Sequence, residues 1–459
     1  MDLLPPKPDQ LVSAANNIAH KVLYGGLADL RPMPRTLIDD GELREVYHYR
    51  PAARVVESGD PVLLVTPLAA PALCFDLRRG CSLVEHFVTR GRRTYLVEYG
   101  QVSFRNRTLG MEHWVDEVLP EAIRAVSEHA GGRPVHLVGW SLGGIFTMLT
   151  AADQPSLPIA SLTVVGSPVD VRKVPLVAPM RPLLNLTDGR GVITRAYKAL
   201  GGVPTPLVRW AFQLSSVQKI LTKPLAVAAN LDDADYLAQI EAVDRFTANM
   251  IAYPGRSFGQ LYHRMIKGNA LVEGSMPFGD RTIELSEIKA PVLVFGGATD
   301  GIAPIKAVKA VVPLLTGSEE VRFEIVPGGH LGMLTGRAAR TTTWQVMDEW
   351  IEKWSEAGPG QAAKKVAAKK AAKKATVKKP GAEKSAKKTT VKKPPAKKTA
   401  AAKKTAAKKK PGAEKSAKKA TVKKATVKKA PAKKASGPEA IGVNPVRRYG
   451  SASSRSLGS

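Results

Sequence analysis

The sequence predicts an α/β fold whose central sheet is mostly parallel and carries helices on both faces. Short β-type apolar runs alternate with helix-type patterns, and such alternation is typical of crossover connections between parallel strands. The apolar runs of strand length are 61–68, 94–100, 136–140, 162–168, 291–297 and 321–328. Because these runs are nearly continuous in apolar residues, we expect strands that are buried on both faces.

The alternation is interrupted between 171 and 286, where the pattern is helical and shows no obvious strand. We therefore expect one α/β core that is divided by an inserted helical cap. The expected segments are a helical N-terminal leader at 1–50, the first part of the core at 51–170, the cap at 171–286, the second part of the core at 287–357, and a disordered C-terminal tail at 358–459.

The leader contains an amphipathic stretch at 9–27. Its polar face is not rich in Lys or Arg, as the polar face of a membrane-surface helix commonly is. We therefore expect this stretch to pack on the core, with attachment to a membrane surface as the alternative.

The formal net charge of +29 lies in the tail. Residues 361–459 hold 32 Lys and Arg against three Glu, so residues 1–360 are neutral overall. The tail repeats KKPGAEKSAKK at 378–388 and 409–419 and has no aromatic residue before Tyr449. A segment with so much charge and so little apolar surface is expected to be disordered.

Several classes of protein are disfavoured by the composition. No run of about 18 uncharged apolar residues is present, and the N-terminus lacks the pattern of a secretory signal. Cys74 and Cys81 are too few for a disulfide framework. No His/Cys group has metal-ligand spacing, so neither a metal nor another cofactor is expected. A cytoplasmic location follows as the expectation, with association to a nucleoid or a storage granule as an extension of it.

The run VHLVGWSLGG at 135–144 is the most informative local pattern. A β-type segment ends at Trp140, Ser141 follows, and a helical pattern begins within the next residues. This context is typical of the nucleophile elbow of an α/β-hydrolase fold, in which small flanking residues allow a sharp strand-to-helix turn. We predict Ser141 as a nucleophile and the backbone amide of Leu142 as an oxyanion donor.

A second G-x-S-x-G pattern surrounds Ser257. Pro254 precedes it and no strand is expected there, so the strand–turn–helix context is missing. We interpret this second copy as a turn that opens a helix rather than as a catalytic site.

In this fold the acid and the base follow the nucleophile in chain order, first Asp or Glu and then His. Asp300 follows the run at 291–297, and His330 follows the run at 321–328 after two glycines. We predict that His330 takes the proton of Ser141 and that Asp300 orients the imidazole. The second oxyanion donor is expected in the loop after the first strand, at Leu68, with Ala69 as the alternative.

Several longer segments resemble the polyhydroxyalkanoate synthase-like α/β-hydrolases over most of residues 50–355. They are VTPLAAPALCFDLRRGCSLVEHF, YLVEYG, VHLVGWSLGG, YHRMIKGNALVEG, IELSEIKAPVLVFGGATDGIAP and VPGGHLGMLTGRAA. The resemblance also implies Asp300 and His330 as partners of residue 141. The polymerising synthases carry Cys at the elbow, whereas this chain carries Ser141. An oxygen ester transfers its acyl group less readily than a thioester, so the change favours hydrolysis.

The sequence therefore favours a serine hydrolase acting on a lipid ester, a hydroxyalkanoate oligomer or an acyl thioester such as an acyl-CoA. One alternative is a synthase-like acyltransferase, and another is a nucleoid or granule scaffold with a vestigial hydrolase body. The lysine doublets of the tail resemble those of linker-histone tails. Within it, residues 361–434 are expected to bind nucleic acid without sequence preference. An anionic lipid or granule surface is the alternative partner, and polyphosphate is a third; the oligomeric state stays open.

Overall fold

The computed structural model describes residues 7–175, 177, 191–214 and 217–355. The predicted basic tail and the first six residues lie outside the described part. Among the described helices, none combines the length and the apolar character needed to cross a bilayer.

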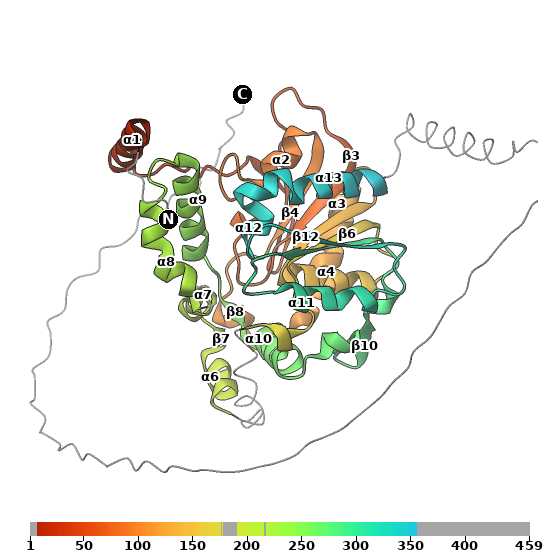
Figure 1. Ribbon diagram of the computed structural model, residues 1–459. Helices are drawn as coiled ribbons and strands as arrows, with labels where there is room; N and C mark the ends of the chain where they lie inside the picture. The colour runs from red at the N-terminus through yellow and green to blue at the C-terminus, as the bar shows by residue number, and fades with distance from the viewer. Residues whose placement is uncertain (1–6, 176, 178–190, 215–216, 356–459) are drawn as a thin grey trace, which may run out of the picture. The chain divides into compact units, whose positions relative to one another are not determined.

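An eight-stranded sheet forms the centre of the described chain, in the order β1-β2-β4-β3-β5-β6-β11-β12 (Figure 1). Strand β2 runs antiparallel to β1 and β4, and every other neighbouring pair is parallel. The strands are β1 (Arg35–Gly41), β2 (Arg44–Tyr49), β3 (Ser58–Val65), β4 (Arg92–Glu98), β5 (Val135–Trp140), β6 (Ile159–Val165), β11 (Val292–Gly297) and β12 (Val321–Val326). All six runs predicted as strands form strands, and β5 and β11 are buried along their whole length.

Helices cover both faces of this sheet, as predicted. Helices α3 (Leu119–His129) and α4 (Leu142–Asp153) belong to the core on one face. Helices α2 (Leu83–Thr89) and α13 (Thr343–Trp354) belong to the core on the other face. The mostly parallel sheet with two covered faces confirms the predicted fold class.

The N-terminal leader differs from its prediction in its second half. Helix α1 (Pro8–Tyr24) is present, but β1 and β2 form a hairpin at the edge of the sheet where a helical leader was expected. Asp40-Gly41 ends β1 directly before the two-residue turn Glu42-Leu43, and β2 is rich in aromatic and β-branched residues. These are hairpin signals that the helical interpretation overlooked.

Helix α1 contacts the rest of the protein through polar side chains. Gln10 donates to Asp232, Asn17 donates to the carbonyl of Leu231, and Lys21 pairs with Glu241. The apolar side of this helix is exposed, at Leu11, Val12, Ile18, Val22 and Leu23. The helix is thus in contact with the rest of the protein, but through its polar side, and its apolar side is exposed.

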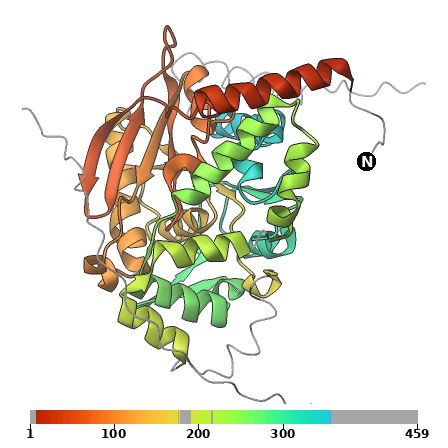
Figure 2. The same cartoon turned by 90° about the vertical axis from the view of Figure 1, so that its left-hand side faces the viewer.

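The segment between β6 and β11 is mainly helical, and its helices lie together along one side of the sheet (Figure 2). Its helices are α6 (Val192–Leu200), α7 (Thr205–Leu214), α8 (Val217–Ala228), α9 (Ala234–Ala248), α10 (Gly255–Gln260) and the π-helix η6 (Leu261–Lys267). Two short antiparallel pairs add strands that the sequence did not reveal. They are β7 (Gly202–Val203) with β8 (Tyr253–Pro254), and β9 (Ser275–Phe278) with β10 (Arg281–Glu284).

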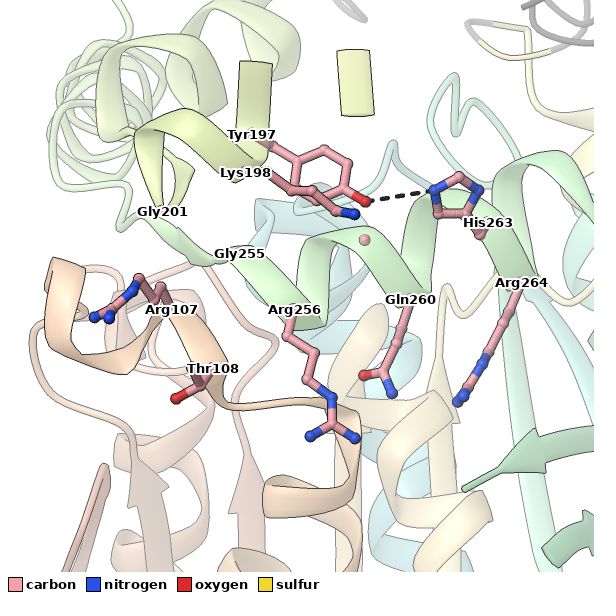
Figure 3. Close-up of a pocket in the computed structure, with 11 residues that line it drawn as sticks. Arg107, Thr108, Tyr197, Lys198, Gly201, Gly255, Arg256, Gln260, His263 and Arg264 are labelled. Atoms are coloured by element: carbon pink, nitrogen blue, oxygen red, sulfur yellow. Dashed lines mark hydrogen bonds between the residues drawn. The ribbon is translucent and has the colours of Figure 1, made fainter. Parts of the chain in front are cut away.

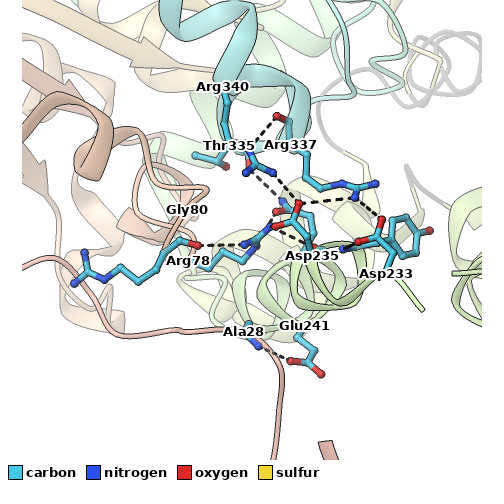
Figure 4. A network of polar contacts seen from close by, with 12 residues as sticks. Ala28, Arg78, Gly80, Asp233, Asp235, Glu241, Thr335, Arg337 and Arg340 are labelled. Atoms are coloured by element: carbon cyan, nitrogen blue, oxygen red, sulfur yellow. Dashed lines mark hydrogen bonds and ion pairs between the residues drawn. The ribbon is translucent and has the colours of Figure 1, made fainter. Parts of the chain in front are cut away.

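A network of ion pairs fastens α9 to the core (Figure 4). Asp235, near the start of α9, accepts from Arg78 at 2.7 Å and from Arg340 at 2.8 Å. Asp233, which caps the same helix, pairs with Arg337 at 2.7 Å. Arg78 is buried, so its charge depends on Asp235 for compensation. The network fixes the position of α9 above the carboxyl edge of the sheet.

Candidate active site

Ser141 stands between β5 and α4 with φ 53° and ψ −118°. A non-glycine residue in this region is strained by about 1–3 kcal/mol, and the surrounding structure must hold it there. Its amide donates to the carbonyl of Val165 at 2.8 Å, and its carbonyl accepts from the hydroxyl of Ser167 at 2.6 Å. Val165 is the last residue of β6 and Ser167 follows it by two positions, so the end of the neighbouring strand and the loop after it stabilise the turn.

The glycines around Ser141 permit a close approach of backbone segments. A Cβ atom at Gly139 would lie 2.6 Å from the Cα of Gly144, and one at Gly143 would lie 2.5 Å from the carbonyl oxygen of Val65. No side chain fits at either position without backbone movement. The glycines therefore bring the start of α4 against the ends of β3 and β5, as the elbow pattern requires.

Asp300 and His330 are joined at the carboxyl ends of β11 and β12. The Nδ1 atom of His330 lies 2.8 Å from Oδ2 of Asp300, and the Asp300 side chain is fully buried. The other carboxylate oxygen, Oδ1, accepts from the amides of Ile302 at 2.8 Å and Ala303 at 2.9 Å. Both oxygens are thus engaged, and the carboxylate is fixed in orientation toward the imidazole.

His330 also contacts the elbow. The indole N–H of Trp140, the residue before Ser141, donates to the carbonyl of His330 at 3.0 Å, and the two rings are 5.0 Å apart. A Cβ atom at Gly166 would lie 3.3 Å from Nδ1 of His330, so the imidazole packs over the end of β6. The three predicted residues Ser141, Asp300 and His330 thus lie at the same edge of the sheet.

The two predicted oxyanion donors belong to adjacent segments. Leu142 is the first residue of α4, where a backbone amide has no partner within the helix. The loop with Leu68 and Ala69 follows β3, whose last carbonyl lies against Gly143. Ala69 has φ 66°, an uncommon value for a residue other than glycine. Whether Leu68 or Ala69 donates stays a prediction.

Comparison with known proteins agrees with this architecture. The Alpha/beta hydrolase family matches residues 45–341. The chain belongs to the alpha/beta hydrolase family.

Within this family the chain is polyhydroxyalkanoate synthase-like. It is 23% identical over 355 residues to the poly(3-hydroxyalkanoate) polymerase subunit PhaC of Allochromatium vinosum, which covers 75% of this chain and 98% of the relative. It is 22% identical over 358 residues to the subunit of the same name from Thiocystis violacea, which covers 76% and 98%. A soluble variant of monoglyceride lipase from Saccharomyces cerevisiae, at 14% identity and a TM-score of 0.46, covers 72% of this chain and 96% of that one. This last similarity adds nothing to what the topology and the family match establish.

Helix α9 of this alpha/beta hydrolase covers the elbow from above. Phe246 of α9 is fully buried and packs edge-on against Trp140, with ring centroids 5.9 Å apart. The amide of Ile251, just after α9, donates to the carbonyl of Ala69 at 2.9 Å. The inserted segment therefore contacts both the predicted nucleophile loop and the predicted oxyanion loop. Sequence reasoning missed Trp140 and Phe246, because nothing local marks a contact between residues about 100 positions apart.

Ser257, the serine of the second G-x-S-x-G pattern, is buried within α10. Its hydroxyl donates to the carbonyl of Leu109 at 2.7 Å. The helical environment agrees with the interpretation of this copy as a turn and helix rather than an elbow.

A second histidine–aspartate pair joins α2 to α13. Nε2 of His86 is 2.8 Å from Asp348, and Nδ1 of His86 lies 2.9 Å from Arg90. Both ring nitrogens are occupied, which leaves none to accept a proton from a nucleophile. His136, in β5, is bound to hydroxyls on both sides, and burial lowers its pKa to about 3. We therefore assign structural roles to His86 and His136.

Proposed function

We propose that the protein is a serine hydrolase that cleaves an acyl ester through an acyl-serine intermediate. The observation that carries this proposal is the hydroxyl of Ser141 on a strained elbow, at the same sheet edge as the buried Asp300–His330 pair. The substrates we propose are lipid esters, hydroxyalkanoate oligomers or acyl thioesters.

In the proposed reaction the oxygen of Ser141 attacks the acyl carbon as His330 takes the hydroxyl proton. The carbonyl oxygen becomes an oxyanion, which the amide of Leu142 and an amide at Leu68 stabilise. The bond to the leaving group then breaks, and the leaving group receives the proton from His330. Water, deprotonated by His330, attacks the acyl-serine, so that an acid is released and the Ser141 hydroxyl is restored. Asp300 keeps the imidazole in the Nδ1-protonated tautomer throughout.

The oxygen at residue 141 separates this chain from the polymerising synthases that it resembles. A thioester on cysteine retains a high transfer potential, so an acyl group can be passed to another hydroxyacyl group. An oxygen ester is a weaker donor, and an activated water competes for it. We therefore favour hydrolysis over chain growth.

The second candidate is acyl transfer, as in a polymer synthase. It is supported by relatives that are named polymerase subunits and that match over 98% of their own length. The two candidates differ in the acceptor of the acyl group, which is water in hydrolysis and the hydroxyl of another hydroxyacyl group in transfer.

One experiment separates these candidates. The full chain is incubated with a panel of acyl esters and with hydroxyacyl-CoA thioesters, and free acid and polymer are both measured. We expect free acid from wild type, none from Ser141→Ala, and full activity from the control Ser257→Ala. Because the control loses one buried hydrogen bond, its melting temperature should fall by only a few °C. Polymer from wild type would select acyl transfer. Failure of a fluorophosphonate probe to label Ser141 would support the scaffold with a vestigial body.

We also propose that the basic tail tethers the enzyme to a polyanion. The excess of 29 positive charges in residues 361–459 supports binding to nucleic acid through the release of counterions. The segment has no aromatic residue before Tyr449 on which bases could stack, so no preference for single strands is expected. An anionic lipid surface is the other outcome that the test distinguishes.

A further inference from the structure

A cationic cavity lies between α6, the helix formed by α10 and η6, and the short helix η2 (Phe104–Thr108) that follows β4 (Figure 3). Its volume is about 520 Å³, which is within the range of small-molecule sites. Four of its lining side chains are cations, namely Arg107, Lys198, Arg256 and Arg264, and a fifth, His263, can be protonated. None of the predicted catalytic residues lines this cavity.

The positive charge of the cavity is poorly compensated. Glu112 is the carboxylate in contact with it, at 3.4 Å from Arg256 and 3.8 Å from Arg264. Burial alone would raise the pKa of Glu112. The hydrogen bond from Gln260 and the charges of the two arginines outweigh burial, so the pKa lies below its ordinary value and the carboxyl group is ionised. Arg107 and Lys198 have no ion-pair partner among the residues that the structure describes. Among the described residues, the four cations of the lining are thus balanced by one carboxylate, which contacts only two of them.

Arg264 supplies a second observation that points to a ligand. Its Nη1 atom is buried, and the carboxylate oxygen of Glu112 lies 3.8 Å from it, too far for a hydrogen bond. No other described residue accepts a hydrogen bond from this atom. A buried guanidinium donor without an acceptor is costly, and an oxyanion in the cavity would satisfy it.

The pKa of His263 reflects its burial and the positive charge around the cavity. Burial, followed by Lys267 and Lys198, lowers the pKa of its imidazole. Its Nε2 atom lies 3.4 Å from the hydroxyl of Tyr197, so the ring faces the cavity wall rather than a carboxylate. A bound anion would oppose the two lysines and raise this pKa.

The glycines of the second G-x-S-x-G pattern form part of the wall. Gly255 and Gly259 both line the cavity. A Cβ atom at Gly259 would lie 2.8 Å from the hydroxyl of Tyr197, so only glycine lets α6 approach α10 this closely. Ser257, between them, points away to Leu109. The pattern that lacked a catalytic context therefore shapes this cavity.

We propose that this cavity binds a phosphate-bearing anion of the diphosphate type. Arginine matches phosphate oxygens with paired donors, and cations spread over the walls of a 520 Å³ space suit an anion larger than one phosphate. The shared chemistry is the diphosphate group, whether it is free or carried by a nucleoside. The site does not depend on Ser141 being a nucleophile.

The test is calorimetric titration of the full chain with inorganic pyrophosphate and, separately, with adenosine diphosphate. Because any binding of phosphate to the basic tail is the same in every variant, the comparison is between Arg107→Gln/Arg264→Gln and the surface control Arg124→Gln. We expect the double variant to bind at least tenfold more weakly than wild type, the control to match wild type, and Ser141→Ala to bind normally. Equal affinity for both ligands would identify the diphosphate alone as sufficient, and tighter binding of adenosine diphosphate would identify a nucleotide.

A second readout protects the test against misfolding of the double variant. The imidazole resonance of His263, assigned with His263→Gln, should titrate at higher pH when pyrophosphate is present. Arg264→Lys, which keeps the charge, should retain part of the affinity. An unmoved His263 resonance, or equal binding by wild type and the double variant at a common melting temperature, would overturn the proposal.

Discussion

Asp300→Asn offers the sharpest test of the proposed triad, because the structure dictates how the new amide is oriented. In the wild type, Oδ1 of Asp300 accepts from the amides of Ile302 and Ala303, and Oδ2 faces Nδ1 of His330 at 2.8 Å. In the variant the amide oxygen must take the place that faces the two backbone donors. The amide NH₂ group then faces His330 and donates to Nδ1, so the ring proton moves to Nε2. A His330 protonated at Nε2 cannot accept a proton from Ser141.

The expected loss of activity arises because His330 no longer acts as a general base, although the fold is retained. We expect kcat to fall about 10⁴-fold, as when the tautomer is wrong in a Ser-His-Asp triad, which corresponds to about 5 kcal/mol of transition-state stabilisation. The two backbone hydrogen bonds persist, so the melting temperature should change by no more than about 4 °C.

The assay is hydrolysis of the best ester found for the wild type, with the melting temperature measured on the same preparations. The matched control is Asp244→Asn, in which an exposed carboxylate that pairs with Lys223 receives the same change. The control should retain full activity. Retention of more than about one tenth of wild-type kcat by Asp300→Asn would refute the triad as we propose it.

Three further predictions concern the strand, the inserted segment and the tail. The unfolded state binds a proton at the usual histidine pKa of 6.5, whereas His136 in the folded state titrates at about 3, so stability should be lost as the pH falls below 6.5. Between pH 8 and pH 5 the loss should be about 2 kcal/mol in urea unfolding, and His136→Gln should lack it. Asp235→Asn should lower the free energy of unfolding by about 1–2 kcal/mol, since Asp235 is partly exposed, and should speed amide exchange in α9. Unchanged exchange rates in α9 would contradict the conclusion that this network holds the helix in place. DNA binding by the full chain should weaken steeply with salt and should be lost in residues 1–358; a tail-dependent affinity indifferent to salt would contradict counterion release.

The strands and the site loops could be predicted because their signals are local. Each strand is a short apolar run, and Asp300 and His330 both follow such runs in the chain order that the fold imposes. The glycines around Ser141 indicated the elbow, because a Cβ atom at Gly139 or Gly143 would lie only 2.5–2.6 Å from a neighbouring backbone atom. These features need no knowledge of distant segments.

The parts that were missed depend on contacts between distant segments or on competing local signals. Helix α1 has a regular amphipathic pattern, and the pattern alone does not say which side meets the body. Asp232 and Glu241, about 220 residues away, hold its polar side, and this choice is tertiary. The contact of Phe246 with Trp140 is likewise invisible to periodicity. The hairpin of β1 and β2 was different, because Asp40-Gly41, directly before its turn, is a local signal that the interpretation overlooked.

The pairing of β6 with β11 has a consequence for how the chain folds. The two strands are neighbours in the sheet, yet residues 166–291 lie between them along the chain. Closing so long a loop costs entropy before any ladder hydrogen bond forms, and a high contact order of this kind slows folding. The strand that leads to Asp300 can dock only after the whole inserted segment has been synthesised. We therefore expect that β3, β4 and β5 gain protection from exchange first during refolding, and that the proposed triad is assembled last.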